Sequence, residues 1–240
     1  MANPCRRFTC DKIELRLSGG KVVGVLLSIM LTGGCVEGPT GEMRAADESP
    51  AFPLGEWVSL FDGQSLDGWK KLEEDAFVGK GPVRVENGSM ILARGGMQTG
   101  VRWTGDFPRD NYEVLLDAMR VDGRDFFCGL TFPVGDEPCT LICGGWGGMV
   151  VGLSNVDDMH AAENLTTTSM QFENDKWYRI HLEVTSDRIR TIIDDEVMID
   201  LEREDHRFSV WWEQSPVKPF GVSTWDTGGA IRNIQVRRTP

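Results

Sequence analysis

A polar segment after an apolar stretch carries the residues best suited to acid–base chemistry. Asp157, Asp158 and His160 lie between Asn155 and Asn164. Histidine titrates near neutral pH, so His160 is a candidate general base, with Asp157 a second catalytic candidate and Asn155 a substrate ligand. The two aspartates could also chelate a hard cation, although the spacing matches no calcium-binding loop. The alternative is a solvated loop at the rim of a sheet.

A glycine-rich segment, Cys143–Gly148, places four glycines around Trp146. Glycine permits close approach of the backbone to a ligand, and an open indole face suits stacking against a pyranose ring. Trp146 is therefore a candidate for substrate binding. The alternative is a β-bulge with a buried tryptophan.

Charged residues on and beside a long predicted strand form a third group. Asp117 alternates onto the face opposite Tyr112, and Arg120 and Arg124 follow it. If that face is the concave face of the sheet, Asp117 is the best catalytic carboxylate and the arginines bind substrate. Otherwise Asp117 is an ordinary exposed strand residue.

Tryptophan is unusually frequent, with eight residues against two tyrosines, which suggests that some indoles form exposed platforms. Trp211 and Trp212 are adjacent, so a strand would direct one ring into the core and the other outward. Trp212 and Trp225 are the further candidates for substrate binding.

Short strands must position these residues. The Asn87–Gly88 pair predicts a hairpin within residues 83–92. Residues 112–121 alternate, whereas 126–134 are almost all apolar, as in a central strand. Further strands are predicted at 148–155, 177–185, 188–194, 196–201, 220–225 and 230–237.

These patterns predict an all-β fold, a two-sheet jelly-roll sandwich over residues 56–240. Helical periodicity is nowhere sustained beyond a turn or two, and no internal repeat indicates a propeller. The many glycines and prolines, 28 and 11, suit frequent turns.

The N-terminal residues resemble an export signal. Basic residues up to Lys21 precede the apolar run 22–31, and Thr32-Gly33-Gly34 lead to Cys35. This predicts a lipoprotein-type signal peptide over 1–35, lipid on Cys35 and a flexible linker over 36–55. Thr32 departs from the leucine usual at that position. The predicted location is outside the cytoplasm, as a cell-envelope lipoprotein or a secreted protein; a retained anchor and a cytoplasmic protein are the alternatives.

Net charge limits the partners. The formal charge is −12, and removal of residues 1–34, which carry five basic and two acidic side chains, makes it −15. Such a surface repels nucleic acid and anionic headgroups, so neither is an expected partner, and membrane contact is expected only through lipid on Cys35. No cofactor, metal site or protein partner is predicted.

Three cysteines remain in the predicted domain: Cys128, Cys139 and Cys143. This odd number fits one disulfide plus a free thiol and three buried thiols equally well. A zinc site is not expected, because no second His or Cys pair stands at zinc-finger spacing elsewhere in the domain.

Two motifs carry a family resemblance. The domain opens with Trp57-Val-Ser-Leu-Phe-Asp-Gly-Gln-Ser-Leu-Asp-Gly-Trp69 and ends with Ile231-Arg-Asn-Ile-Gln-Val236. Over residues 56–238 it resembles the 3-keto-disaccharide hydrolase domain family, as a divergent member. The resemblance implies a concanavalin-like jelly roll that acts on glycosides oxidised at C3. The motifs themselves suit turns, caps and sheet ends, so they identify the fold and do not locate the chemistry.

The chain departs from its relatives where they typically carry an arginine and acidic or amide side chains. Pro133 falls near the arginine position, and Val150 and Gly152 fall at the positions of glutamate and glutamine. If this alignment holds, the usual acid–base groups are missing.

Three functions remain open. The first is an exported hydrolase or lyase acting on 3-keto-glycosides. The second is a carbohydrate-binding jelly-roll module without catalysis. The third is a structural or adhesive lipoprotein. Titratable groups beside an exposed tryptophan in the concave face favour the enzyme.

Overall fold

The computed structural model describes residues 52–74 and 77–240. The predicted signal peptide, the lipidation site at Cys35 and most of the predicted linker lie outside the described residues. The last four linker residues already belong to the domain: Phe52 is buried against Phe107, and Gly55 N donates to Arg238 O at 2.8 Å. In the described part of the chain, no helix is long and apolar enough to cross a membrane.

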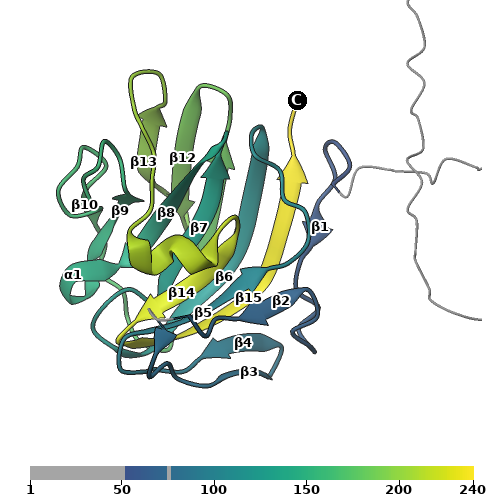
Figure 1. Ribbon diagram of the computed structural model, residues 1–240, viewed down its shortest axis with the longest axis vertical. Coiled ribbons are helices and arrows are strands. Elements are labelled where there is room, and N and C mark those ends of the chain that lie inside the picture. Colours follow the sequence, from purple (N-terminus) through teal and green to yellow (C-terminus); the bar gives the residue numbers. More distant parts are fainter. Residues whose placement is uncertain (1–51, 75–76) are drawn as a thin grey trace, which may run out of the picture. The chain divides into compact units, whose positions relative to one another are not determined.

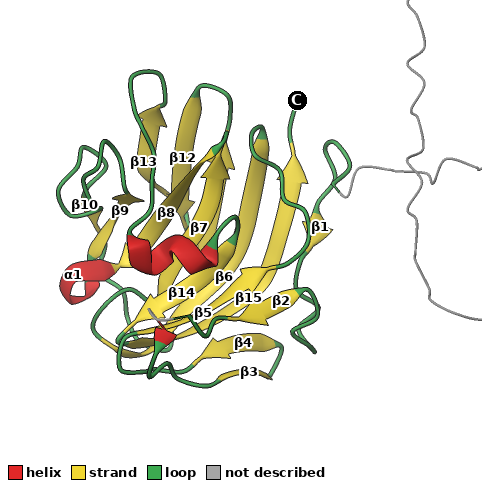
Figure 2. Cartoon of the chain, in the orientation of Figure 1, coloured by secondary structure: helices red, strands yellow, loops and turns green. Residues whose placement is uncertain are grey.

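Two antiparallel sheets stack as a sandwich (Figures 1 and 2). Sheet A has the order β13-β12-β11-β6-β15-β4-β3, with β1 paired to β15. Sheet B has the order β10-β9-β8-β7-β14-β5-β2. The strands of sheet A are β1 (Val58–Ser59), β3 (Val83–Glu86), β4 (Ser89–Leu92), β6 (Tyr112–Gly123), β11 (Trp177–Val184), β12 (Arg188–Ile193), β13 (Glu196–Glu202) and β15 (Thr227–Arg238).

The strands of sheet B are β2 (Trp69–Lys71), β5 (Gln98–Trp103), β7 (Cys128–Val134), β8 (Glu137–Gly144), β9 (Val150–Ser154), β10 (Thr168–Ser169) and β14 (Gly221–Trp225). A one-turn helix, α1 (Gly145–Gly148), joins β8 to β9, and a 3₁₀ helix, η2 (Trp212–Val217), precedes β14. The predicted all-β sandwich is confirmed, including the hairpin at Asn87 and Gly88, whose φ angles of 50° and 75° fit a type I′ turn.

Two inner strands of sheet B escaped prediction because they do not alternate. β5 has a glycine at its centre and begins with buried polar side chains, Gln98 and Thr99. β8 is buried along its last six residues, so neither face has the polar positions that mark a strand.

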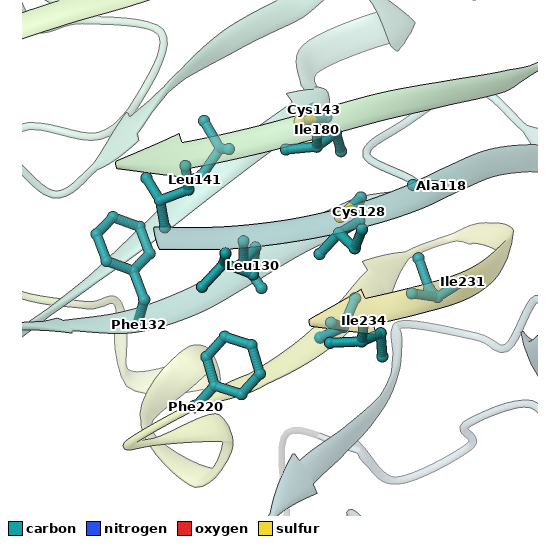
Figure 3. Close-up of a cluster of buried hydrophobic side chains, with 14 of the residues drawn as sticks. Ala118, Cys128, Leu130, Phe132, Leu141, Cys143, Ile180, Phe220, Ile231 and Ile234 are labelled. Atoms are coloured by element: carbon teal, nitrogen blue, oxygen red, sulfur yellow. The ribbon is translucent and has the colours of Figure 1, made fainter. Parts of the chain in front are cut away.

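The core lies between the sheets (Figure 3). Ala118, Ile180 and Ile231 from sheet A meet Leu130 and Leu141 from sheet B, and all are buried. The alternation of β6 is as predicted: Tyr112, Val114, Leu116 and Ala118 face this core. The intervening residues of β6 therefore lie on the outer face of sheet A.

The two sequence motifs that flank the domain serve the fold. Asp62 Oδ1 accepts hydrogen bonds from the backbone N–H groups of Gln64 and Ser65 at 2.7 and 2.8 Å, which lower the pKa of Asp62. Trp69 Nε1 donates to Leu60 O at 2.7 Å in the buried end of the sandwich. The opening motif is therefore a capped turn with an aromatic anchor.

Glycines on the outer face of sheet B let covering segments lie directly on the strands. A Cβ on Gly129 would stand 2.9 Å from the Phe126 ring, and one on Gly152 would stand 2.6 Å from the carbonyl oxygen of Ala161. Likewise, a Cβ on Gly100 would stand 2.9 Å from Phe77, and one on Gly221 would stand 2.7 Å from Val217. No side chain larger than hydrogen fits beneath these contacts.

Two segments make use of these glycines. η2 contributes Val217 to a small buried cluster with Leu72 and Phe77, and it crosses the strands of sheet B in Figure 2. The loop that follows β9 contributes Ala161 to a cluster with Phe126 and Ile142. The outer face of sheet B is therefore covered on two sides.

All three domain cysteines are free and buried, which decides between the alternatives left open by the sequence. Cys128 and Cys143 are direct partners across β7 and β8. Burial raises the pKa of the Cys139 thiol, and the contact with Cys128 together with burial raises that of Cys143. The thiols of Cys139 and Cys143 therefore stay protonated at neutral pH.

We predict that the domain thiols are inert in the folded protein. In a chain with Cys5, Cys10 and Cys35 replaced by Ser, a thiol-reactive dye should label none of the remaining cysteines under native conditions and all three in urea, because modification needs an exposed thiolate. Mass spectrometry counts the adducts. Rapid native labelling, or failure to label in urea without reductant, would contradict three buried free thiols.

We also predict that Gly152→Ala destabilises the fold by about 1–3 kcal/mol, because the added methyl overlaps the Ala161 carbonyl oxygen. Urea unfolding measures the change. Gly96→Ala is the matched control, since the nearest atom to its added Cβ is 3.7 Å away. Equal stability of the two variants would contradict the close covering of β9.

Candidate functional site

The uncovered part of the outer face of sheet B forms a pocket of about 370 Å³. This volume is in the range of small-ligand sites. The lining side chains come from strands β5, β8, β9 and β14, the segment between β6 and β7, the α1 turn, the loop after β9 and the η2 segment: Gln98, Asp125, Phe126, Ile142, Trp146, Ser154, His160, Trp211, Glu213, Gln214 and Trp225.

Trp146 is held outward by an unusual backbone. It has φ 47° and ψ 58°, a left-handed conformation that is costly for a bulky residue, between Gly144 at φ 83° and Gly147 at φ 93°. The indole is 46% exposed, so the predicted open ring is present and the predicted alternative of a buried bulge is not.

His160 stands against two of the indoles. Its ring stacks on Trp146 with centroids 4.8 Å apart and planes 26° apart, and it lies 6.2 Å from the Trp211 ring at a tilt of 39°. The Nδ1 atom accepts from Ala162 N at 3.3 Å, and Nε2 lies 3.1 Å from a carboxylate oxygen of Glu163. Both ring nitrogens of His160 are therefore engaged within its own loop.

The loop that carries His160 is fixed to the sheet by one amide. Asn164 Nδ2 donates to the carbonyl oxygens of Leu153, Met159 and His160 at 2.7 to 3.0 Å. Because these acceptors lie on both the strand and the loop, the position of His160 is set by the position of β9.

Two carboxyl groups line the pocket. Asp125 is half-buried just before β7 and accepts a hydrogen bond from Phe126 N at 2.7 Å. Burial raises the pKa of Asp125, although backbone N–H groups oppose the shift. Glu213 lies in the first turn of η2, and among the described residues no Lys, Arg or His forms an ion pair with it.

Two amides complete the polar lining. Gln214 Oε1 accepts from the Ser223 hydroxyl at 2.9 Å, so the group that Gln214 can present to the pocket is its NH₂. Gln98 pairs with Trp225 across β5 and β14, and the two side chains therefore share the outer face of sheet B.

The structure places Asp117 away from this pocket. It lies on the outer face of sheet A, where Arg179, Arg232 and Asn233 donate to its carboxylate at 3.2, 3.3 and 2.7 Å. The hollow face belongs to the other sheet, so the condition under which Asp117 would be catalytic is not met. The closing motif, Arg232–Asn233, instead binds this buried carboxylate.

Asp157, Asn155 and Arg120 also serve the structure. Asp157 accepts from Arg207 N at 3.0 Å and lies 2.7 Å from His206 Nδ1, and the backbone contact followed by the histidine contact lowers its pKa. Asn155 bonds to the side chains of Ser154 and Ser209 at 3.0 and 3.3 Å.

Arg120 hydrogen-bonds to the turn that carries Trp146. Its guanidinium donates to Gly148 O at 3.2 Å, to Asn174 Oδ1 at 2.8 Å and to Phe172 O. Arg124 is exposed and lines a neighbouring hollow that shares Asp125 and Trp225 with the pocket. It does not line the pocket itself.

The tryptophan pair is arranged differently from the prediction. Trp211 and Trp212 precede and begin a 3₁₀ helix, so strand alternation does not apply and both are exposed, at 44% and 61%. Trp211 lines the pocket and Trp212 does not. Of the predicted residues, Trp146, His160 and Trp225 line the pocket together.

Sequence reasoning missed Asp125, Glu213, Gln98, Gln214 and Trp211. Asp125 and Glu213 each lie beside a residue that drew attention, Arg124 and Trp212, but nothing local marks them. Gln98 lies in a strand that was not predicted. The described residues contain no group of three His, Cys, Asp or Glu side chains that could hold a metal ion.

Solved structures with a similar fold include a laminarinase, a transglycosylase and a glucanase. A laminarinase from Flavobacterium sp. UMI-01 is 13% identical, with 78% of this chain and 100% of that chain covered and a TM-score of 0.53. The Crh5 transglycosylase bound to NAG is 12% identical, covering 78% and 86%, with a TM-score of 0.54. At this identity the likeness shows the fold alone.

A third structure, a non-specific endo-beta-1,3(4)-glucanase from family GH16, is 12% identical over 78% of this chain and 96% of that chain, with a TM-score of 0.50. No curated protein matches the chain. A family model described as the 3-keto-alpha-glucoside-1,2-lyase-like domain matches residues 56–237, nearly the whole described domain. The chain therefore belongs to the 3-keto-alpha-glucoside-1,2-lyase-like domain family.

Proposed function

We propose that this domain is a carbohydrate-active enzyme that cleaves glycosides carrying a ketone at C3, by elimination across C1 and C2 followed by addition of water. The observation that carries the proposal is the pocket on sheet B, where three tryptophans surround two carboxyl groups. Indole faces suit pyranose rings, and paired carboxyls suit proton transfer. Membership of the family supplies the substrate class.

The ketone makes this cleavage accessible to ordinary side chains. A C3 carbonyl acidifies the proton on C2, so a base can remove it and leave an enolate. The electron pair then forms the C1–C2 double bond as the C1–oxygen bond breaks, and the leaving oxygen takes up a proton. Water adds to the product across the same bond. Each proton transfer needs one positioned group.

Glu213 and Asp125 are suited to these two transfers. Glu213, which has no cationic partner among the described residues, serves as the base for the C2 proton. Asp125, whose pKa is raised by burial, holds a proton for the leaving oxygen. His160, with both nitrogens engaged in its own loop, acts as part of the wall that orients the sugar.

A carbohydrate-binding module without catalysis is the second candidate. It is favoured by the outer face of β9, which carries no acidic or amide side chain: Val150 packs against the cluster of Phe126 and Ile142, and Gly152 lies beneath Ala161. Among the residues that the structure describes, no lysine or arginine lines the pocket. An oxyanion would then be stabilised by neutral hydrogen-bond donors alone, which suits binding as well as it suits catalysis.

Two substrates with different leaving groups distinguish the proton transfer of Glu213 from that of Asp125. With a 3-keto-disaccharide, Asp125→Asn and Glu213→Gln should each lower kcat by about 100-fold or more, because both transfers are needed. With a 3-keto-glucoside of an activated aryl alcohol, which departs without a proton, Asp125→Asn should lose little activity while Glu213→Gln stays impaired. Release of sugar and of the aryl alcohol measures the rates, with Asp136→Asn, an exposed carboxylate 93% accessible, as the control.

The pH dependence of the cleavage rate tests the role of Asp125 as the proton donor. A proton donor is active below its pKa, so cleavage of the disaccharide should fall as pH rises through the raised pKa of Asp125, and the aryl substrate should lack that alkaline limb. If the wild-type protein binds these sugars and releases nothing, the binding module is the correct function.

Export is a further part of the proposal, since the domain follows a segment that resembles a lipoprotein signal. In a bacterial host fed a radiolabelled fatty acid, the wild-type chain should incorporate label and Cys35→Ser should not, because the thioether forms at that cysteine. Cys10→Ser is the matched control. Equal labelling of all three chains, or of none, would contradict lipidation at Cys35.

A further inference from the structure

Gln98 is buried in the wall of the pocket without hydrogen-bond partners. Gln98 is 1% exposed, and among the described residues neither its Oε1 nor its Nε2 has a hydrogen-bond partner. Buried amides normally have their donors and acceptors satisfied, because an unmade hydrogen bond costs free energy that water would otherwise supply. The fold therefore retains an amide that destabilises the free protein.

The surroundings of Gln98 show that its side chain lies on the pocket side of β5. Its backbone belongs to β5 and pairs with Trp225 of β14, so the side chain lies on the same outer face as that indole. Thr99, the next residue, points the other way and bonds to Ala93 O at 2.9 Å and to Gly81 N at 2.8 Å. Local folding thus satisfies the polar group that faces inward and leaves the pocket-facing one unpaired.

We infer that Gln98 binds the substrate, with Nε2 donating to the ketone oxygen and Oε1 accepting from the adjacent hydroxyl. This inference rests on the proposed function. A primary amide presents one donor and one acceptor side by side, and a hydroxyl next to a ketone presents the complementary pair. The amide is neutral, so it can remain buried before the ligand arrives.

The same geometry gives Gln98 a share in the reaction. A donor at the C3 oxygen strengthens its hydrogen bond as that oxygen gains charge, which favours loss of the C2 proton. Gln214 provides a second NH₂ in the same pocket, but its Oε1 is already bonded to Ser223, so it cannot pair with a hydroxyl and a ketone together. Because Gln98 is buried, a ligand can contact it only after the Gln98 side chain rotates or a neighbouring ring shifts.

The test measures both the thermal stability and the ligand affinity of variants at Gln98, which we expect to change in opposite directions. Gln98→Met keeps the length of the side chain and removes both polar atoms. We expect its Tm to rise by about 2–4 °C and its affinity for 1,5-anhydro-3-keto-glucitol, which has no leaving group at C1, to fall about tenfold. Tryptophan fluorescence titration measures the affinity, and thermal unfolding measures Tm. Gln98→Leu provides a second apolar variant.

Thr191→Val is the matched control. Its hydroxyl is also buried and without a partner among the described residues, but it lies in β12 of sheet A, away from the pocket. It should gain stability and keep wild-type affinity. Affinity within twofold of wild type in the Gln98 variants, or a fall in their Tm, would overturn the inference.

The outcome is separable from the proposed reaction. If the wild-type protein binds the anhydro ketone through Gln98 but cleaves no 3-keto-glycoside, the inference holds and the enzyme proposal fails. If it cleaves such glycosides at a rate and affinity that Gln98→Met leaves unchanged, the enzyme proposal holds and the inference fails.

Discussion

The pocket depends on one steric constraint, the absence of side chains at four positions on the outer face of sheet B. Gly100, Gly129, Gly152 and Gly221 allow Phe77, Phe126, Ala161 and Val217 to lie directly on the strands. Side chains at these positions would overlap with the covering residues, so η2 and the loop after β9 could not lie this close to the strands. The glycines therefore convert a wide concave sheet into a small pocket with defined walls.

Hydrogen-bond partners distinguish the polar groups that line the pocket from those that hold the fold together. Asp117 and Asp157 are carboxylates whose acceptor positions are occupied by donors of the fold. Glu213 and Gln98 are lining groups that the described fold leaves without such partners. A polar group that is fully paired in the folded chain has little to offer a ligand, whereas an unpaired one gains free energy when a ligand pairs with it.

The departure from family pattern has a structural counterpart. Val150 and Gly152 lie on the pocket side of β9, but the loop carrying Ala161 covers that strand, so a long acidic or amide side chain would have no room. The carboxyl groups that line the pocket lie instead at Asp125, just before β7, and at Glu213 on η2. Moving such groups from strands to connecting segments places them at the rim, where loops commonly carry binding and catalysis.

The sequence alone determined the class of fold, most of the strands, the Asn87–Gly88 turn and the inward face of β6, because these follow from periodicity within a few residues. It marked Trp146 through its flanking glycines, but it left open whether the ring is exposed or buried in a β-bulge. Alternation cannot say which of two sheets has the hollow face, so it predicts Asp117 as the catalytic carboxylate and does not identify Asp125. It also cannot show that Trp211 and Trp212 enter a 3₁₀ helix, or that Gln98 lacks a partner. Those facts arise from contacts between segments far apart in the chain, and only the tertiary structure brings those segments together.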